Sequence, residues 1–503
     1  MRFLALNLSA NRAIIRIRLY RWIAAALAMS LLLSACSKGE SGKESAGEPA
    51  TIKIMSWNEQ TFQTEFGMLF YAMHPEIDVK VANMGRLTTG QVDDYEKAFD
   101  EFVKEERPDV LMLSLNQYKR YAADGRLVSL ESFLTRDKID LEGFIPGLIE
   151  DLRETGGGEL YGLTPQFIGQ AIYYNKDLFD RFGVSYPTDK MSWEELLNLA
   201  ARFPSDGSEE DRVWGLGFSY PHDLYQLGQR IGTTLGLRLI NPADKSLLID
   251  SDAWVKVYEI AHKALRSGAI HQENSTFIGG SYEEYLLSNP FIAGKVAMML
   301  EGSYLMLQIR EAAGAVPDKA VKNWDLVTVP VDPSNPDYTH ETSYYQIFAI
   351  NADSPNIEAA WKFIRYIHSD DYARVKSKSS TGQLPIRTKY IQDEEGRNVA
   401  AFYALKPSNS DLYAGMDDLP QDFLMQLYPV SAEELNAVME DKKTVEEALS
   451  SIKTRLQAAL EEALANQADG GEAAGAGSSS GVAFETGVSV ESGASDGSDE
   501  AGE

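Results

Sequence analysis

The sequence predicts an α/β protein whose folded body has two lobes and lies between a processed leader and a polar tail. The first observation is the order strand, helix, strand between Thr51 and Leu113, which implies a parallel sheet covered on both faces. The second is size, because a body from Thr51 to Ala465 has about 415 residues, more than one hydrophobic core usually supports. The third is composition, which separates both ends of the chain from this body.

The amino-terminal segment predicts export and lipidation. Residues 1–35 hold five arginines and no acidic residue, and an apolar run extends from Trp22 to Leu33. A basic flank before a short apolar core is typical of a secretory signal, and the run is shorter than the roughly 20 residues that span a bilayer. It ends in Leu33-Ser34-Ala35-Cys36, which resembles a bacterial lipobox. We expect Cys36, the only cysteine, to be lipidated and to anchor the mature protein on the outer face of the cytoplasmic membrane.

Two polar segments flank the body, and the chain as a whole is acidic. Residues 36–50 are rich in Ser, Gly, Glu and Lys and predict a flexible tether. Residues 466–503 hold eight acidic residues, no basic residue and many Gly, Ser and Ala, a composition that predicts a disordered tail. The whole chain has 47 basic and 75 acidic residues and a net charge of −28. This excess of acid disfavours nucleic acid and anionic lipid as ligands.

The first part of the body alternates between strand and helix patterns. Apolar and polar residues alternate in the first segment as in a half-buried strand, and apolar runs and turn residues delimit the others. The predicted elements are strand 51–57, helix 62–73 ending at His74-Pro75, strand 77–81, helix 91–106, strand 108–113, and a helix with its connection over 118–130, turning at Asp124-Gly125.

Capping boxes predict two later helix starts. Ser192 with Glu195 predicts the first, and Thr444 with Glu447 begins a helix expected over 444–464. An apolar stripe on that last helix predicts core packing rather than a partner surface; its members are Val445, Ala448, Leu449, Ile452, Leu456 and Leu460. We also expect Trp193, Trp254 and Trp361 to be packing residues.

Four motifs in one order carry a family resemblance. They are Tyr173-Tyr174-Asn175-Lys176-Asp177-Leu178-Phe179 followed by Trp193-Glu194-Glu195-Leu196, then Phe291-Ile292-Ala293-Gly294-Lys295 with Glu301-Gly302-Ser303-Tyr304, then Ile347-Phe348-Ala349-Ile350-Asn351 with the segment 354–364, and finally Gly382-Gln383-Leu384-Pro385. Together they resemble the family 1 extracellular solute-binding proteins of the maltodextrin-binding type.

The resemblance implies a fold and a set of partners. The fold would be the two-lobed periplasmic-binding-protein fold, type II-like, with a hinge and a ligand cleft. One lobe would hold 51–170 and 323–367, and the other 171–322 and 368–465. The protein would deliver its ligand to the permease subunits of an ABC importer with a cytoplasmic ATPase. We expect a monomer.

Candidate ligand contacts follow from strand ends and from the chemistry of sugars. Ligands of open α/β sheets bind outside the carboxyl ends of the strands, and a sugar needs aromatic rings for its faces and polar side chains for its hydroxyls. The candidates are Trp57, Asn58, Glu59, Ser114, Gln166, Trp214, Tyr220, Tyr304 and Tyr345. In the family the position of Tyr304 usually holds a Trp that stacks on ligand. For each aromatic residue, ordinary core or hinge packing is the alternative.

No pattern predicts catalysis, a cofactor or a metal. Gly294-Lys295 lacks the first glycine and the Ser or Thr of a phosphate loop. The six histidines form no His-Glu-x-x-His pair, and there is no Gly-x-Ser-x-Gly elbow. The family resemblance implies a binding protein for a small polar solute, and the aromatic and polar candidates favour a mono- or oligosaccharide. A sensor that presents ligand to a membrane receptor and a surface carbohydrate-active enzyme, which needs only two carboxylates, remain as alternatives.

Overall fold

The computed structural model describes residues 49–87, 95–204, 212–272, 279–344, 346–378, 382–393, 395–408, 416 and 419–469. The predicted signal segment 1–35, Cys36, most of the tether and all of the tail after Asp469 lie outside these residues. So does Tyr345, one of the candidate ligand contacts.

The first sheet is built from the amino-terminal strands and one strand from much later in the chain. Its order is β2 (Ile77–Asn83), β1 (Ala50–Ser56), β3 (Val110–Leu113), β11 (Ile347–Ile350) and β4 (Gly162–Leu163). Strands β1 and β3 pair in parallel, as the alternation of strand and helix predicts. Strand β11 is antiparallel to both of its neighbours, so the sheet is mixed rather than wholly parallel.

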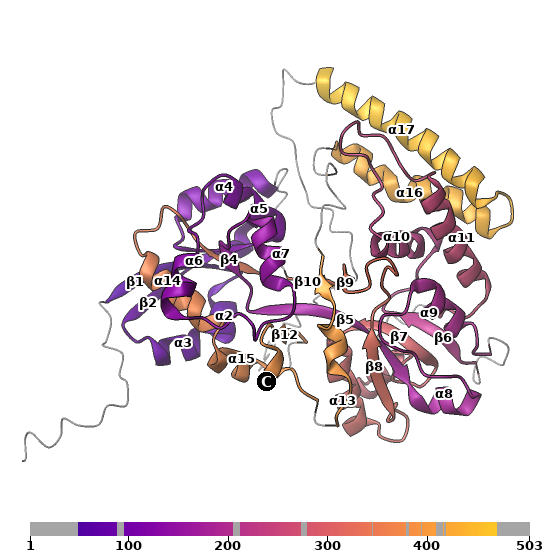
Figure 1. Ribbon diagram of the computed structural model, residues 1–503, viewed down its shortest axis with the longest axis horizontal. Coiled ribbons are helices and arrows are strands. Elements are labelled where there is room, and N and C mark those ends of the chain that lie inside the picture. The colour runs from indigo at the N-terminus through magenta and orange to yellow at the C-terminus, as the bar shows by residue number, and fades with distance from the viewer. Residues whose placement is uncertain are drawn as a thin grey trace, which may run out of the picture. The chain divides into compact units, whose positions relative to one another are not determined.

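The helices around the first sheet follow the predicted order (Figure 1). One continuous helical segment is made of α2 (Glu59–Phe62), the π-helical η1 (Gln63–Gly67) and α3 (Met68–Met73), and it ends at His74 as predicted. The other helical elements are η2 (Met84–Leu87), α4 (Tyr95–Glu106), α5 (Leu115–Ala123), α6 (Glu131–Asp137), α7 (Leu148–Thr155), α14 (Ile357–Ile367) and α15 (Asp370–Lys376).

Aromatic packing joins the two chain segments that build this region. The Phe66 ring stacks on Tyr372 of α15 at 5.9 Å between centroids and meets Phe348 of β11 edge-on. Phe363 of α14 contacts Phe66 and Phe70 in the same way. Trp361 is also buried, which confirms its predicted packing role. Residues far apart in sequence therefore share one core, because each side alone exposes its rings to water.

The second sheet is organised on the long strand β5 (Gln166–Asn175). Its first residues pair with β12 (Leu384–Pro385) and β10 (Thr342–Ser343). From Gln170 onward β5 pairs with β7 (Val296–Gly302) and β8 (Trp324–Thr328), both antiparallel. Strand β6 (Trp214–Phe218) pairs in parallel with β7 at the outer edge. A separate two-stranded sheet joins β9 (Tyr338–Thr339) to β13 (Lys406–Pro407).

These pairings bear on two of the predicted lobe borders, which stay predictions. Within residues 323–367, which the family resemblance puts in the first lobe, β8 pairs with β5 of the second sheet. After residue 368, where the resemblance implies the second lobe, α15 packs on the first-sheet helices through Tyr372, and Lys376 pairs with Glu65. The sequence motifs locate the points where the chain passes between lobes only within several residues, because the motifs lie in helices and strands and not in the loops between them.

Helices and a short 3₁₀ segment complete the second-sheet region. They are α8 (Lys176–Phe182), α9 (Trp193–Ala200), α10 (Leu224–Thr234), α11 (Asp252–Arg266), α12 (Tyr282–Ser288), α13 (Tyr304–Ala315), η4 (Val399–Phe402), α16 (Gln421–Met439) and α17 (Val445–Asp469). The 3₁₀ segment η3 (Thr388–Tyr390) lies with the first-sheet helices instead, because the Thr388 amide donates to the Gly143 carbonyl and Lys389 pairs with Asp370 of α15. Helices α16 and α17 pack on each other and on α10 and α11, as the upper right of Figure 1 shows.

The predicted capping boxes and core residues are confirmed here. The Ser192 hydroxyl accepts from the Glu195 amide, and the Glu195 carboxylate accepts from the Ser192 amide at 2.8 Å. Thr444 and Glu447 form the same pair of bonds. All six residues of the predicted apolar stripe on α17 are buried. This helix continues to Asp469, four residues into the segment predicted as the tail.

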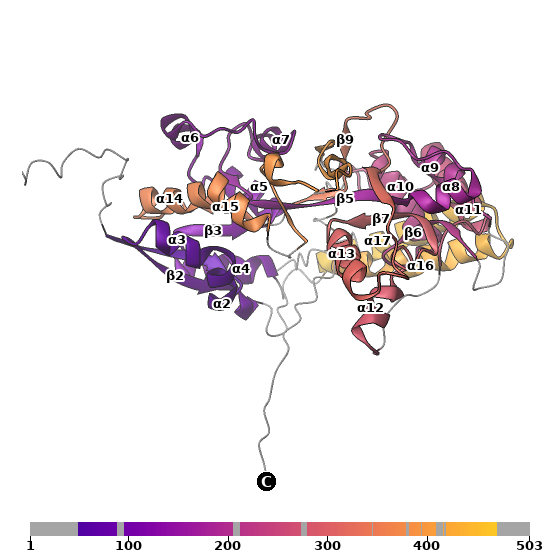
Figure 2. The ribbon, with the colours of Figure 1, turned by 90° about the horizontal axis from the view of Figure 1, so that it is seen from below.

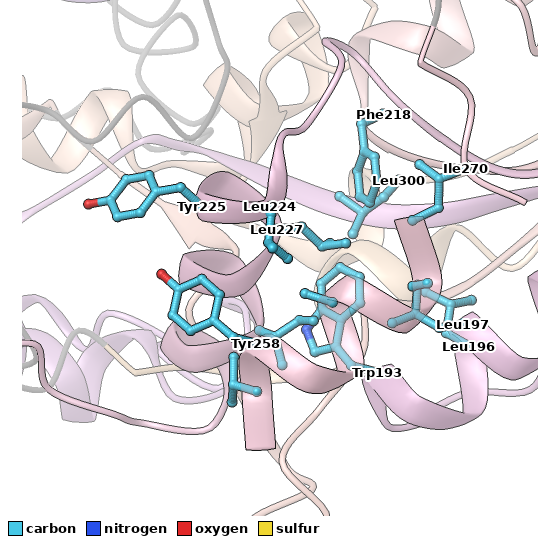
Figure 3. Close-up of a cluster of buried hydrophobic side chains, with 14 of the residues drawn as sticks. Trp193, Leu196, Leu197, Phe218, Leu224, Tyr225, Leu227, Tyr258, Ile270 and Leu300 are labelled. Carbon is cyan, nitrogen blue, oxygen red and sulfur yellow. The ribbon is translucent and has the colours of Figure 1, made fainter. Parts of the chain in front are cut away.

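Figure 3 shows part of the core that holds the second sheet to its helices. Trp193 is buried against Phe218, and its indole N–H donates to Thr234 Oγ1 at 2.8 Å. Trp254 is buried beside Tyr258, and its N–H donates to the Arg238 carbonyl. Each indole nitrogen therefore has a partner although the ring is in the core, as buried Trp requires.

Candidate ligand-binding site

Two neighbouring strands of the second sheet end side by side. Strands β6 and β7 are parallel, with Trp214 opposite Val296 and Phe218 opposite Leu300. Their carboxyl ends therefore lie at one edge, where β5 contributes Gln170 opposite Gly302. Ser219 and Tyr220 directly follow β6, and Ser303 and Tyr304 directly follow β7. We call this group of residues the strand-end site.

A partly buried carboxylate lies at the end of β7. Glu301 Oε1 accepts a hydrogen bond from the Gly302 amide at 2.7 Å, and Oε2 accepts from the Ser219 hydroxyl. Burial raises the pKa of Glu301 above its usual value, although both hydrogen bonds and the nearby Arg230 act in the opposite direction. Glu301 thus holds the loop after β6 against the end of β7.

An ion pair fixes three chain segments at the same edge. Arg230 of α10 donates from Nε and Nη2 to the two carboxylate oxygens of Glu341, at 3.0 and 2.9 Å. Nη2 also donates to Gln170 Oε1 at 2.6 Å. The Arg230 and Glu341 side chains are only 15% and 10% exposed. A forked pair of this kind fixes direction as well as charge, so α10, β5 and the segment before β10 are tied together.

The loop after β6 is ordered by a neutral histidine. The His222 ring stacks on Phe218 at 4.3 Å between centroids, and Nδ1 lies 2.8 Å from the Tyr220 carbonyl. Burial, together with the charge of Arg230, lowers the pKa of His222 to about 4. At neutral pH the ring is therefore uncharged, and because a carbonyl only accepts, Nδ1 carries the proton and Nε2 is left as an acceptor.

Three tyrosines near these groups are half exposed. Tyr220 is 49% exposed, Tyr304 is 48% exposed and Tyr428 of α16 is 49% exposed. The Tyr428 hydroxyl donates to Asp223 Oδ2 at 2.8 Å, and Asp223 caps α10 immediately after the β6 loop. Exposed rings beside buried polar groups are the combination that a polyhydroxylated ring needs, with aromatic faces for its C–H surface and charged or amide groups for its hydroxyls.

The first sheet also presents candidates at one edge. Trp57 and Ser114 follow the parallel neighbours β1 and β3, so both lie at the edge formed by the carboxyl ends of these strands. Trp57 is partly buried. Asn58 Oδ1 caps α2 by accepting from the Thr61 amide, and Ser114 forms a capping box with Gln117.

Both Asn58 and Ser114 therefore have a structural role that the sequence prediction missed. Glu59 is exposed and accepts from Gln63 Nε2 at 2.9 Å. Contact of these residues with a ligand stays a prediction.

The candidate Gln166 lies in a buried environment. Gln166 begins β5, is 6% exposed, and its Nε2 has no hydrogen-bond partner among the described residues. A buried amide donor of this kind calls for a ligand or a water molecule.

The surroundings of Trp214 favour the packing alternative. It is 3% exposed, meets His271 edge-on and lies under Arg212. It also begins β6, at the opposite end of the strand from Tyr220.

Sequence reasoning missed Gln170, Arg230, Glu341 and Tyr428. Arg230 lies in sequence between Leu227 and Ile231, both buried residues of α10. A charged side chain among such apolar positions could have been recognised in the sequence as a candidate for a buried ion pair. Gln170 is likewise a polar residue within an apolar strand. Glu341 and Tyr428 give no comparable signal, because their partners come from segments 111 and 205 residues away.

We also searched the described residues for a metal site and for a membrane-spanning helix. They contain no group of three or more His, Cys, Asp or Glu placed to hold a metal ion. Within the same part of the chain, none of the helices has the length and apolar character needed to cross a bilayer.

Comparisons with known proteins agree with this architecture. Among solved structures, the chain resembles a sugar transporter of Rhizobium etli in an open conformation, with a TM-score of 0.56, 22% identity, and coverage of 81% of this chain and 99% of that one. It also resembles the sugar-binding protein MalE of Xanthomonas citri, with a TM-score of 0.58, 18% identity, and coverage of 84% and 100%. At these identities the likeness establishes the fold, that of the two-lobed periplasmic binding proteins.

Sequence comparison gives the family. A candidate binding protein of Brucella abortus is 28% identical over 255 residues, which are 50% of this chain and 57% of the relative. The chain thus matches little more than half the length of the curated relatives. The model of the bacterial extracellular solute-binding proteins matches residues 56–374, well over half of the chain. The chain therefore belongs to the bacterial extracellular solute-binding protein family.

Proposed function

We propose that this protein captures an uncharged saccharide outside the cytoplasm, without changing it chemically, and delivers it to an ABC importer. The observation that carries the proposal is the strand-end site, where half-exposed Tyr220 and Tyr304 adjoin the largely buried Arg230–Glu341 pair and the partly buried Glu301. The relatives from Rhizobium etli and Xanthomonas citri are named for sugar transport and sugar binding.

The charge of the site supports an uncharged ligand. Arg230 is neutralised by Glu341 through two hydrogen bonds, and His222 carries no charge at neutral pH. Glu301 has a raised pKa, so its buried site already disfavours negative charge. A sugar acid would bring a carboxylate into this site. None of these groups is an unpaired cation that could neutralise it, so the desolvation of the carboxylate would weaken binding. Neutral hydroxyls can instead share the oxygens of Glu301 and Glu341 as acceptors.

Binding would be coupled to transport through lobe closure. In this mechanism Tyr304 and Tyr220 of the second sheet contact one side of the ligand, and Trp57, Asn58, Glu59 and Ser114 of the first sheet contact the other. Gln166 at the start of β5, and Tyr345, would complete the site. A ligand that contacts both lobes only in the closed form shifts the population toward that form. The permease subunits of the importer, with their cytoplasmic ATPase, would recognise it.

The cellular setting is part of the proposal. Lipidation of Cys36 would hold a monomeric protein on the extracytoplasmic face of the membrane, and residues 37–50 would act as its tether. This placement keeps the binding site near the importer without immobilising it.

A thermal-shift screen of the full-length chain tests the proposal. A ligand that binds only the folded state raises the melting temperature by mass action. The panel pairs neutral saccharides with the matching acids, for example glucose with glucuronate and galactose with galacturonate, and adds di- and trisaccharides. A shift with neutral saccharides alone is expected. A larger shift with the acids contradicts the charge argument, and no shift with any saccharide contradicts carbohydrate capture.

A further inference from the structure

The chain segment before β12 meets the end of β7 beside Tyr304. Along β5, Phe167 lies opposite Leu384 of β12, and Gln170 lies opposite Gly302 of β7. Helix α13 follows β7 directly and packs beside α12, as Figure 2 shows. Strands β12 and β7 therefore follow one another along β5, and the residues just before β12 come close to the start of α13.

One hydrogen bond joins these two segments. The Ser303 hydroxyl donates to the Gly382 carbonyl from a residue that is only 5% exposed. Ser303 stands at the position before α13 where a serine usually caps a helix, yet among the described residues its hydroxyl makes no capping bond with α13. The hydroxyl is therefore used to hold a segment 79 residues further along the chain instead of its own helix.

Gly382 has both a backbone conformation and a close neighbour that favour glycine. Its φ of +72° lies in the left-handed region, where a side chain is strained. A methyl group added at Gly382 would stand 2.9 Å from Tyr304 Cδ2 and 3.0 Å from Tyr304 Cβ, whereas carbon atoms in contact are about 3.5–4.0 Å apart. The bare backbone of Gly382 therefore lies against the base of the Tyr304 ring.

This contact restrains a ring whose backbone is already fixed. The Gly302 carbonyl accepts from the buried Tyr173 hydroxyl at 2.7 Å, and the Gly302 amide donates to Glu301 Oε1 at 2.7 Å. Because Tyr304 begins α13, its Cα cannot shift unless the helix moves. The ring can still turn about χ1, whose staggered positions are about 120° apart. Gly382 blocks one direction of this turn, and 48% of Tyr304 stays exposed.

We propose that Gly382 and Ser303 are positioning residues for ligand binding, which hold the Tyr304 ring in the orientation that presents it to the ligand. This inference rests on the proposed function, in which Tyr304 contacts the saccharide. It gives a role in binding to two residues that act through the ring. Ser303 fixes the segment, and Gly382 lets that segment approach the ring closely.

Substitution of Gly382 tests this role by calorimetric titration of the full-length chain with glucose, galactose, maltose, lactose and maltotriose. In Gly382→Ala the added methyl group turns the ring. The saccharide that binds the wild type most tightly should then bind about fivefold more weakly, because one aromatic stack is worth about tenfold in affinity at most. Ser303→Ala removes the hydrogen bond and should weaken binding about threefold. In the Tyr304→Ala background, Gly382→Ala should add no loss, since the ring on which it acts is absent.

Gly183→Ala is the matched control. Gly183 has a φ of +64°, and no atom of the described residues outside its immediate surroundings in the chain lies within 4 Å of a methyl group added there. It ends α8, which starts from the end of β5 away from Tyr304, since Asn175 ends β5 and Gln170 is the residue opposite Gly302. This substitution should lower the melting temperature through backbone strain and leave every affinity unchanged.

Crystal structures of the ligand-free wild type and Gly382→Ala provide the second measurement. The Tyr304 side chain should occupy a different χ1 rotamer in the variant, while α13 and β12 keep their places. The same rotamer in both proteins overturns the positioning role, whether or not a saccharide binds.

The outcomes separate this inference from the proposed function. A loss of affinity in Gly382→Ala no larger than in Gly183→Ala, or the same loss with and without the Tyr304 ring, overturns the positioning role and leaves carbohydrate capture standing. The absence of binding by any saccharide in the series overturns carbohydrate capture and the role of Gly382 in it, even where the crystal structures show that Gly382 orients the ring.

Discussion

The ion pair between Arg230 and Glu341 gives the sharpest prediction about what holds the strand-end site together. Replacing Glu341 with Gln keeps the shape of the side chain but leaves the guanidinium of Arg230 without its counter-charge. The pair has N–O distances of 3.0 and 2.9 Å, and both side chains are at least 85% buried. Removal of one partner therefore strands a charge in a poorly hydrated site.

The magnitude follows from that burial. Two unit charges about 3 Å apart attract by about 5 kcal/mol at an effective dielectric constant of about 20. Desolvation cancels much of this attraction in the intact pair, but the stranded charge keeps its own desolvation cost. We expect Glu341→Gln to lower the free energy of unfolding by about 3 kcal/mol. The double variant Arg230→Met with Glu341→Met should lose less than Glu341→Gln alone, because it leaves no buried charge.

Urea unfolding at neutral pH measures these differences, and a surface pair provides the control. Arg266 and Asp441 are paired at 3.1 Å, but their side chains are 49% and 67% exposed. Asp441→Asn should cost less than about 1 kcal/mol. Equal, small losses in Glu341→Gln and Asp441→Asn would refute the reasoning, as would a double variant that is less stable than Glu341→Gln.

Three further predictions concern the leader, the first-sheet edge and acid stability. Cys36→Ala should release the protein from the membrane or leave it unprocessed, which membrane fractionation and acyl labelling would show; unchanged acylation would contradict the anchor. Trp57→Ala should weaken saccharide binding severalfold in calorimetry while far-UV circular dichroism stays unchanged, and unaltered affinity would make Trp57 a packing residue. Burial lowers the pKa of His368 to about 4 from an ordinary value of 6.5, so the unfolded state takes up the proton first and stability should fall as pH decreases from about 6.5 to about 4. The loss of stability reaches about 3 kcal/mol for this residue. Urea unfolding of His368→Gln should therefore show a smaller loss of stability over this pH range than the wild type. The same loss in both proteins would show that other groups cause the pH dependence.

The fold was largely predictable because local signals and the global fold agree. Capping boxes at Ser192 and Thr444, the apolar stripe of α17 and the alternation in β1 each depend on neighbours within a few residues. The antiparallel insertion of β11 was not predictable in this way. Its partner β3 lies more than 230 residues earlier in the chain, and no periodicity encodes pairing at that separation.

The candidate site was only partly predictable, for the same physical reason. Tyr220 and Tyr304 follow strands, and a rule about strand ends finds them. Trp214 shares their chemistry, yet it begins β6 instead of ending it, and its burial beneath Arg212 depends on the fold. Arg230 and Glu341 become a pair only when α10 and the segment before β10 meet.

Calorimetric titration of the full-length chain with the neutral saccharide that gives the largest thermal shift tests the central claim most directly. The wild type is compared with Tyr304→Ala, whose side chain is 48% exposed at the strand-end site, and with Tyr186→Ala, 42% exposed at the opposite edge of the same sheet. The account predicts tight binding by the wild type and Tyr186→Ala and a loss of at least about tenfold in Tyr304→Ala. The same affinity in all three proteins would contradict ligand capture at the strand-end site.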